Sequence, residues 1–265
     1  MKIKEVIAAL EHFAPLPLQD DFDNAGLQVG LTETEVSGAL LCLDVTEAIV
    51  EEAAAKDCNL IIAHHPLVFH PLRRVGDGTY QERCVAAAIR QGITIYAAHT
   101  NLDNAVGGVN YKIAEKMGLH DLNWIEAHDG SVAESGAGVI GTLNKPMNEL
   151  RFLDMLRDTF DVECLMHNEL TGREIRYIAL CGGAGAFLLD KAKALGADAF
   201  VTGEFHYHDY FGNDDILMVE MGHYQSEQFT KNIFRDLLSE RFPDLRIEMT
   251  EINTNPINYY YGKES

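Results

Sequence analysis

The most constraining feature of this chain is an apolar run that ends in two adjacent histidines and a proline. Residues 60–67 read LIIAHHPL. A short continuous apolar run predicts a strand buried on both faces, and Pro66 ends it because proline cannot donate a ladder hydrogen bond. The run therefore predicts His64 and His65 at the carboxyl end of a core strand, where open α/β sheets bind ligands.

Two interpretations of His64 and His65 remain open from the dipeptide alone. Neighbouring residues of an extended segment point to opposite faces. One metal ion would therefore contact both side chains only with difficulty, whereas two adjacent ions could share them. In the other interpretation, one imidazole is buried and hydrogen-bonded and the other is exposed at a turn. Other parts of the chain have to decide between these two.

Composition and charge exclude several classes of function. The 265 residues are enough for one large domain or two modest ones. A formal net charge of -20 repels phosphates and anionic lipid, so we expect no nucleic acid and no membrane as partners. No apolar stretch approaches the roughly 20 residues of a membrane span. Five cysteines without a CxxC pair are typical of reduced thiols in a cytoplasmic protein.

Strands and helices alternate along the chain, which predicts an α/β fold. A strand at 38–45, a helix and the histidine strand form a predicted βαβ unit with a right-handed parallel crossover. We place the crossing between two halves at 120–130 and predict domains at 1–125 and 126–265. Further strands are predicted at 93–98, 139–143, 162–167, 175–181, 198–203, 215–221 and 246–253, and further helices at 79–91, 107–117, 147–160, 185–195 and 224–241.

A repeated pattern indicates that the two halves are similar domains that arose by internal duplication. Residues 40–65 match residues 179–204 at a fixed offset of 139 without a gap, so that His65 falls on Glu204. Any two βαβ units can align in this way. Here, however, the polar residues recur where a ligand site would lie.

A second repeat adds acids to the predicted site. His99-x₃-Asp103 follows one predicted buried strand, and His223-x₃-Glu227 follows another. The carboxyl ends of parallel strands lie together, so we expect a common site formed by His64, His65, Asp103, His223 and Glu227. Nitrogen and oxygen donors without cysteine suit zinc, iron, manganese, nickel or cobalt, and a bridging carboxylate lets two such cations lie about 3.5–4 Å apart.

The predicted donors therefore favour a dinuclear metal centre, with two divalent metal ions per chain. Such a pair lowers the pKa of a bound water to near 7 and provides hydroxide for hydrolysis. No P-loop and no G-x-S-x-G serine motif is present. The sequence GGAG at 182–185 could hold an anion on its backbone amides, or it could be a tight turn.

Two other polar segments have open interpretations. Glu204 could be a metal ligand or a general base, and His206 and His208 would share one face if they lie on a strand. These residues could equally form an exposed rim. The acids of residues 20–23 could be functional, but they stand before a glycine, and we favour their interpretation as turn residues.

With these motifs, the chain resembles the YbgI-like dinuclear metal proteins, often named type 2 GTP cyclohydrolase I homologues. The matching stretches follow the family's order over the whole chain: DNAGLQVG at 23–30, HHPL at 64–67, AHTNLD at 98–103, TGE at 202–204 and GHYQSE at 222–227. Phe22 stands where the family usually carries tryptophan, a difference that we expect to affect packing more than chemistry.

The resemblance implies two similar α/β domains with the dinuclear metal site in the cleft between them. It implies the same five ligands, with His99 beside them or facing the substrate. We take His99 and Glu204 as candidate catalytic residues. The resemblance further implies a toroidal homohexamer of chains that lack the large insertion found in some relatives.

For function, the resemblance implies a metal-dependent hydrolase that acts on a small molecule, a nucleotide or a related heterocycle. In the GTP cyclohydrolase-type reaction, metal-bound hydroxide attacks C8 of guanine and formate leaves. Metal ligands do not specify a substrate, so a phosphoesterase or an amidohydrolase-like activity would use the same centre. The alternative is a non-enzymatic protein that binds and delivers metal, or an interaction scaffold.

Overall fold

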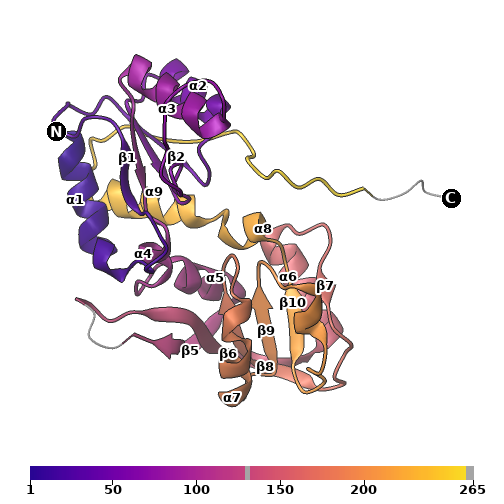
Figure 1. The fold of residues 1–265 in the computed structure, drawn as a ribbon. Helices are drawn as coiled ribbons and strands as arrows, with labels where there is room; N and C mark the ends of the chain where they lie inside the picture. The colour runs from indigo at the N-terminus through magenta and orange to yellow at the C-terminus, as the bar shows by residue number, and fades with distance from the viewer. Residues whose placement is uncertain (129–131, 261–265) are drawn as a thin grey trace.

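Two β-sheets organise the computed structural model, which describes residues 1–128 and 132–260 (Figure 1). Within those residues, the first sheet has the strand order β1-β4-β3-β2-β11 and the second has the order β5-β6-β8-β9-β10-β7. The first sheet consists of β1 (Gly26–Val29), β2 (Ala39–Cys42), β3 (Leu60–Ala63), β4 (Thr94–Ala97) and β11 (Ile247–Met249). The second consists of β5 (Leu119–Ala127), β6 (Gly136–Asn148), β7 (Met166–His167), β8 (Glu174–Cys181), β9 (Ala199–Thr202) and β10 (Leu217–Glu220).

Helices cover both faces of the first sheet. Its central strands β2, β3 and β4 are parallel and buried along their length. Alternate residues point to opposite faces of a strand, so Ile62 packs in the same cluster as α1 (Ile3–Phe13) and α9 (Thr230–Arg241). Ile61 packs with α2 (Glu47–Ala55) and α3 (Tyr80–Gln91) on the other face.

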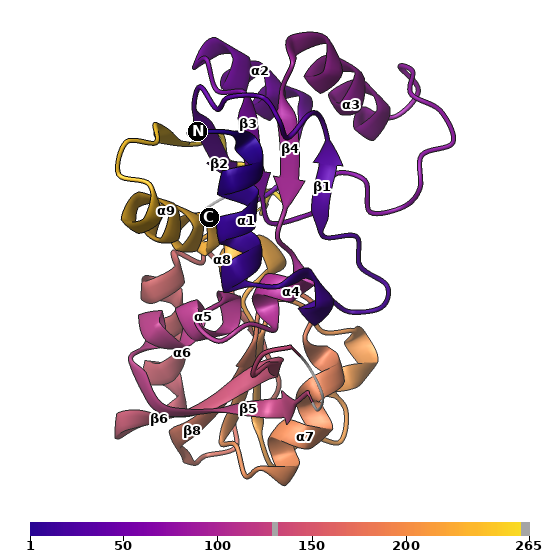
Figure 2. The same ribbon diagram turned by 90° about the vertical axis from the view of Figure 1, so that its left-hand side faces the viewer.

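The second sheet is covered in the same way. One face packs against α5 (Val109–Met117) and α6 (Glu149–Phe160), and the other against α7 (Leu189–Ala194). The cluster under α5 and α6 is continuous with the one under α1 and α9, so one hydrophobic core joins the two sheets. Figures 1 and 2 show α4 (Thr100–Asp103), α5 and α8 (His223–Glu227) at the level between the sheets.

The two sheets repeat one strand register. Ala39 pairs with Leu60 at the start of the β2–β3 ladder, and Ile178 pairs with Ala199 at the start of the β8–β9 ladder. Each residue of the second pair lies 139 positions after its counterpart in the first pair. The alignment by offset therefore matches strands that occupy the same place in two parallel ladders.

The predicted α/β class is confirmed, but the structure differs from the sequence-based interpretation of three elements. The predicted crossing at 120–130 is wrong for residues 120–127, because they lie in β5, which pairs antiparallel with β6 at the edge of the second sheet. Residues 129 and 130 lie outside the described residues. An edge strand needs no continuous apolar run, and β5 alternates polar and apolar residues irregularly. The helix predicted at 224–241 is two helices, α8 and α9, with Gln228 and Phe229 between them. No glycine or proline marks that break.

The third difference concerns residues 206–208, which do not form a strand. The 3-10 helix η3 (Tyr207–Tyr210) begins there, because the backbone N–H of His206 donates to Asp209 and starts a turn. The division of the chain at residues 125 and 126 stays a prediction. In the structure, β11 returns to the first sheet from the second half of the chain, and β5 lies wholly in the second sheet.

The helices of the described residues are too short or too polar to cross a bilayer.

Candidate metal centre

The carboxyl ends of parallel strands in both sheets supply the polar residues of the candidate centre. His64 follows β3 directly, and its buried side chain lies with Nδ1 2.8 Å from the carbonyl oxygen of Ala98. Since a carbonyl only accepts, Nδ1 carries the proton and Nε2 presents a lone pair. That Nε2 is buried without a hydrogen-bond partner, as is Oδ1 of Asp103 at 3.6 Å. A cation between them would satisfy both atoms.

His65 is oriented by an acid that the sequence did not single out. Its Nδ1 lies 2.7 Å from Oδ1 of Asp44, two residues beyond β2, and its Nε2 lies 3.0 Å from Oε2 of Glu227. A carboxylate on the far nitrogen of a metal-binding histidine fixes its tautomer and ring orientation. The available signal was an acid at the end of a predicted core strand.

The short helix α8 supplies His223 and Glu227, which lie four residues apart on one helical face. Nε2 of His223 lies 3.1 Å from Oε2 of Glu227, and its Nδ1 lies 2.7 Å from Oε1 of Glu204. Gly183 allows this close packing. A Cβ there would lie 2.5 Å from Oε1 of Glu227, and the backbone φ of +59° favours glycine.

His99 is held in the same manner as the other imidazoles. Its Nδ1 lies 2.7 Å from Oδ1 of Asp23, whose Oδ2 accepts hydrogen bonds from the backbone and hydroxyl of Thr100. The interpretation of Asp23 as an ordinary turn residue is therefore wrong, because a turn preference and a contact with a distant histidine look alike in sequence. All four histidines are thus hydrogen-bonded at Nδ1.

Three sets of side chains among the described residues could hold a metal ion, and in each the ligand atoms lie within 4.8 Å of one another. The sets are His64, His65 and His99; His65, His223 and Glu227; and His64, Asp103 and Glu227. His64, His65 and Glu227 each belong to two sets. All five predicted ligands are included, and His99, which was predicted as a catalytic residue, is a further candidate ligand.

The electrostatics of the cluster follow from buried imidazoles facing buried acids. Burial opposes the charged form of His65, but its hydrogen bonds to Asp44 and Glu227 raise its pKa to about 10. Burial likewise opposes charge on His223, yet Glu227 raises its pKa to about 9. Burial alone would raise the pKa of Glu227, but the facing histidines hold it well below its usual range. Without a cation, the cluster therefore retains protons that a metal ion would displace.

The pKa values of Asp103 and Asp23 shift in opposite directions. Burial and the neighbouring charge of Glu227 raise the pKa of Asp103 well above its usual range. Burial also acts to raise the pKa of Asp23. The charge of His99 and the hydrogen bonds from His99 and Thr100 outweigh burial and lower this pKa to about 2. Asp23 is thus the firmly ionised acid, whereas Asp103 requires a positive partner to ionise.

The other residues considered from the sequence lie outside the three sets. Glu204 contacts only the outer nitrogen of His223 among the predicted ligands, so it is placed to orient that ring. The side chain of His206 is 93% exposed, and His208 is also exposed in η3. Of the two open interpretations of His206 and His208, the pair on one face of a strand does not hold, and both side chains are exposed, as the other interpretation requires.

The glycine-rich loop at 182–185 is a tight turn. The backbone N–H groups of Gly182, Gly183 and Gly185 donate to the side chains of Asn110, Ser226 and Thr202, at 2.9, 3.0 and 2.9 Å. These amides are already used within the protein, which contradicts the anion-binding interpretation for these three positions.

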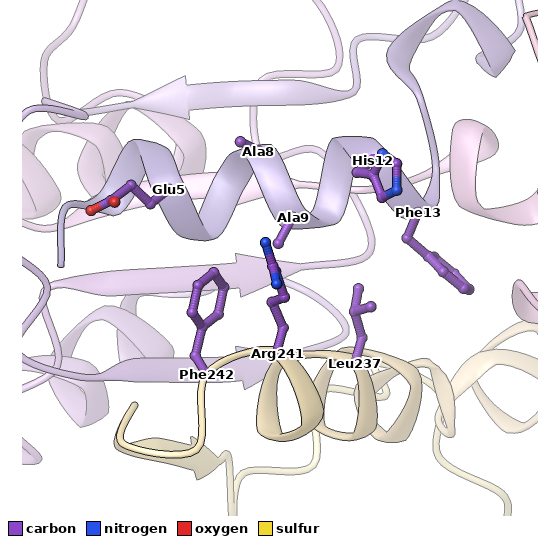
Figure 3. A pocket seen from close by; sticks show the side chains of 8 residues that line it. All are labelled: Glu5, Ala8, Ala9, His12, Phe13, Leu237, Arg241 and Phe242. Carbon is purple, nitrogen blue, oxygen red and sulfur yellow. The ribbon is translucent and has the colours of Figure 1, made fainter.

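A cavity of about 680 Å³ opens beside the cluster. Asp103, His223 and Glu227 line it, and so do Phe22 and Phe187. A second cavity, of about 810 Å³, lies between α1 and α9, where Arg241 and Leu237 point towards α1 (Figure 3). It contains none of the three ligand sets.

Two α/β sheets with a histidine and acid cluster at their strand ends define a class of proteins with a candidate metal site. The chain belongs to the Duf34/NIF3 (NGG1p interacting factor 3) family, whose model matches residues 1–256. The resemblance drawn from the motifs is thereby confirmed.

Individual relatives agree over the full chain. A GTP cyclohydrolase 1 type 2 homolog of Lactococcus lactis is 34% identical over 266 residues, which cover 97% of this chain and 98% of that protein. The crystal structure of Staphylococcus aureus protein SA1388 superposes with a TM-score of 0.89 at 25% identity, covering 98% of this chain and 99% of that one. The protein ybgI, titled as of unknown function, shares the fold with a TM-score of 0.82 at 22% identity, covering 97% and 100%.

Proposed function

We propose that this chain binds two divalent metal ions and acts as a metal-dependent hydrolase on a nucleotide or a related heterocycle. The observation that carries the proposal is the pair of buried, unpartnered ligand atoms, Nε2 of His64 and Oδ1 of Asp103, 3.6 Å apart. Hydrolysis is supported by the relatives named GTP cyclohydrolase 1 type 2 homolog.

Two adjacent ions are supported by the way in which the ligand sets overlap. His64, His65 and Glu227 each belong to two of the three sets. Each imidazole would hold one ion through Nε2, whereas Glu227 has one oxygen near His64 and the other near His65 and His223, so its carboxylate could serve two ions. Asp103 and His223 would complete the set of ligands. A pair of divalent cations at this position would lower the pKa of a bound water and polarise a substrate oxygen. The repeated strand register supports an internal duplication, with the site in the cleft between the duplicated halves.

The chain's own residues fix the geometry of this site. Asp44, Glu204 and Asp23 hold the Nδ1 atoms of His65, His223 and His99, so each ring presents Nε2. We assign His99 to proton transfer at Nε2 with the substrate, because Asp23 holds its Nδ1 and fixes the orientation of the ring beside the cavity. Glu204 acts through His223, as a positioning residue.

A metal-delivery protein is the second candidate function. It is favoured by the partial exposure of His65 and His223, which leaves a bound ion accessible to exchange. This alternative predicts reversible metal binding in proportion to supply and no turnover of nucleotides or phosphoesters. The homohexamer and the cytoplasmic location also stay proposals, and light scattering of the purified protein tests the first of these.

The decisive experiment is metal stoichiometry by elemental mass spectrometry on untagged protein. We expect about two ions per chain of one dominant element, and loss of one or both in Glu227→Ala. Glu115→Ala is the matched control, because Glu115 is exposed and pairs only with the neighbouring Lys112. Unchanged metal content in Glu227→Ala, or no uptake by the native chain, would contradict the proposal. The dominant ion is then used to screen nucleotides and phosphoesters for turnover.

A further inference from the structure

We infer that the cavity beside the cluster takes a flat, phosphate-free heterocycle, such as a free base or nucleoside, rather than a nucleoside triphosphate. The inference deepens the proposed function and rests on it for the position of the reacting ring. It is drawn from the charge of the cavity wall, from the amides of the glycine loop and from two exposed aromatic rings.

The described wall of the cavity carries acids and no lysine or arginine. Its carboxylates are Asp20, Asp103, Glu126 and Glu227. A triphosphate chain needs positive charge or several N–H donors around it. Lys191 forms an ion pair with Glu126, so it compensates one wall carboxylate and is not a free cation for a phosphate.

Three backbone amides of the glycine loop at 182–185 do not replace the missing cations. In the loop that borders the cavity, the amides of Gly182, Gly183 and Gly185 donate to protein side chains. Helix α7, which follows the loop, has only six residues. A phosphate chain would therefore find neither a lysine or arginine side chain nor an amide cradle on this part of the wall.

The metal ions themselves would then be the main positive charge within reach of a phosphate chain. Polyphosphate bound there would occupy the place where the ring has to react. Binding a triphosphate and hydrolysing its ring would therefore compete for one position, a conflict that a phosphate-free ring compound avoids.

The remainder of the cavity suits such a ring. Phe22 is 66% exposed and Phe187 is 65% exposed, and both line the cavity. Exposed aromatic faces in a cavity provide a stacking surface. Asp20 and Glu126 offer carboxylate oxygens, which accept hydrogen bonds from the amino groups and ring N–H groups of a base. The wall thus offers stacking and acceptors, and it lacks phosphate-binding groups.

The test compares guanosine, GMP and GTP, and adenosine with ATP, by calorimetric titration of both zinc-loaded and metal-free protein. Free zinc is measured in parallel, because GTP can chelate the ion. We expect guanosine or adenosine to bind, and the matching triphosphate to bind at least about tenfold more weakly. Equal or tighter binding of the triphosphates, or no nucleoside binding at about 1 mM, would overturn the inference.

Two variants locate the effect. Phe187→Ala should weaken nucleoside binding at least about fivefold, whereas Tyr207→Ala, an exposed aromatic outside the cavity lining, should leave it unchanged. Glu126→Gln frees Lys191 and should shift the preference towards GTP.

If zinc binds with the proposed stoichiometry but the triphosphates are preferred, only the substrate inference fails. If zinc does not bind at all, the proposed function fails, and the metal-free titrations still decide the preference of the cavity.

Discussion

The two sheets build the same parallel ladder but end it in different chemistry. In the first sheet, β3 runs into His64 and His65, which point ring nitrogens into the cluster. In the second sheet, the corresponding strand β9 runs into Gly203 and Glu204, and the acid contacts the outer nitrogen of a histidine. The β2–β3 ladder therefore ends in candidate ligands, whereas the β8–β9 ladder ends in tight turns and in an acid that orients a ligand. A shared backbone register does not dictate a shared role for the side chains at its end.

The largest loss of folding stability and metal binding should come from a substitution at Gly183, in the tight turn of the second sheet. Gly183→Ala adds a Cβ against Glu227 at a positive φ, whereas Gly172→Ala has a positive φ of +74° and nothing within 4 Å. We expect Gly172→Ala to cost about 1–2 kcal/mol from backbone strain, and Gly183→Ala to cost at least about 1 kcal/mol more and to lose metal. Denaturant unfolding and metal content measure both. Equal costs with full metal content would show that the turn does not shape the cluster.

The next comparison is between the two supporting acids. Asp44 is 33% exposed and contacts His65, which belongs to two ligand sets, while Glu204 is 54% exposed and contacts His223, which belongs to one. We expect Asp44→Asn to weaken metal binding about 10–100-fold and Glu204→Gln less. Competition with a chelating dye gives both affinities. A larger loss in Glu204→Gln would contradict the ranking of Asp44 above Glu204 as the supporting acid.

A pH titration distinguishes the two sheets in the metal-free protein. The pKa of His65 is raised from 6.5 to about 10 and that of His223 from 6.5 to about 9. Both groups therefore stabilise the fold fully below pH 6.5, and this contribution is lost as the pH rises through about 9 and then about 10. Thermal unfolding in a chelator, followed by circular dichroism, should show that loss. His223→Asn should remove the loss of stability near pH 9. If the unfolding temperature of the parent protein does not fall as the pH rises, the pairing of these two histidines with the buried acids is refuted.

The smallest effect should come from the C-terminal tail. The hydroxyl of Thr254 donates to Oδ2 of Asp44 at 2.7 Å, and Oδ1 of the same carboxylate contacts His65. We expect Thr254→Val to weaken metal binding only a few-fold, about 1 kcal/mol or less, and Thr254→Ser to restore it. The same dye competition provides the measurement. Loss in both variants alike would point to packing of the tail instead of the hydrogen bond.

Sequence alone was sufficient for those parts in which one signal dominates. The strands β3, β4 and β10 are short apolar runs, and the polar residues that follow them include all five members of the predicted ligand set. The edge strand β5 was missed because it has no such run. Asp23 and Asp44 were missed as partners of histidines because a single acid at a strand end or before a glycine has an ordinary local explanation. Their role depends on contacts across 76 and 21 positions of sequence.

The pairing of β11 with β2 has a consequence for the order in which the protein forms during synthesis. Residues 247–249 complete the sheet that residues 26–97 begin, and Thr254 contacts Asp44 from the tail that Figure 1 shows as an extended yellow segment. A ribosome therefore finishes the second sheet before it delivers the edge strand of the first. The half that is translated first closes last, and until then β2 presents an open edge to other chains.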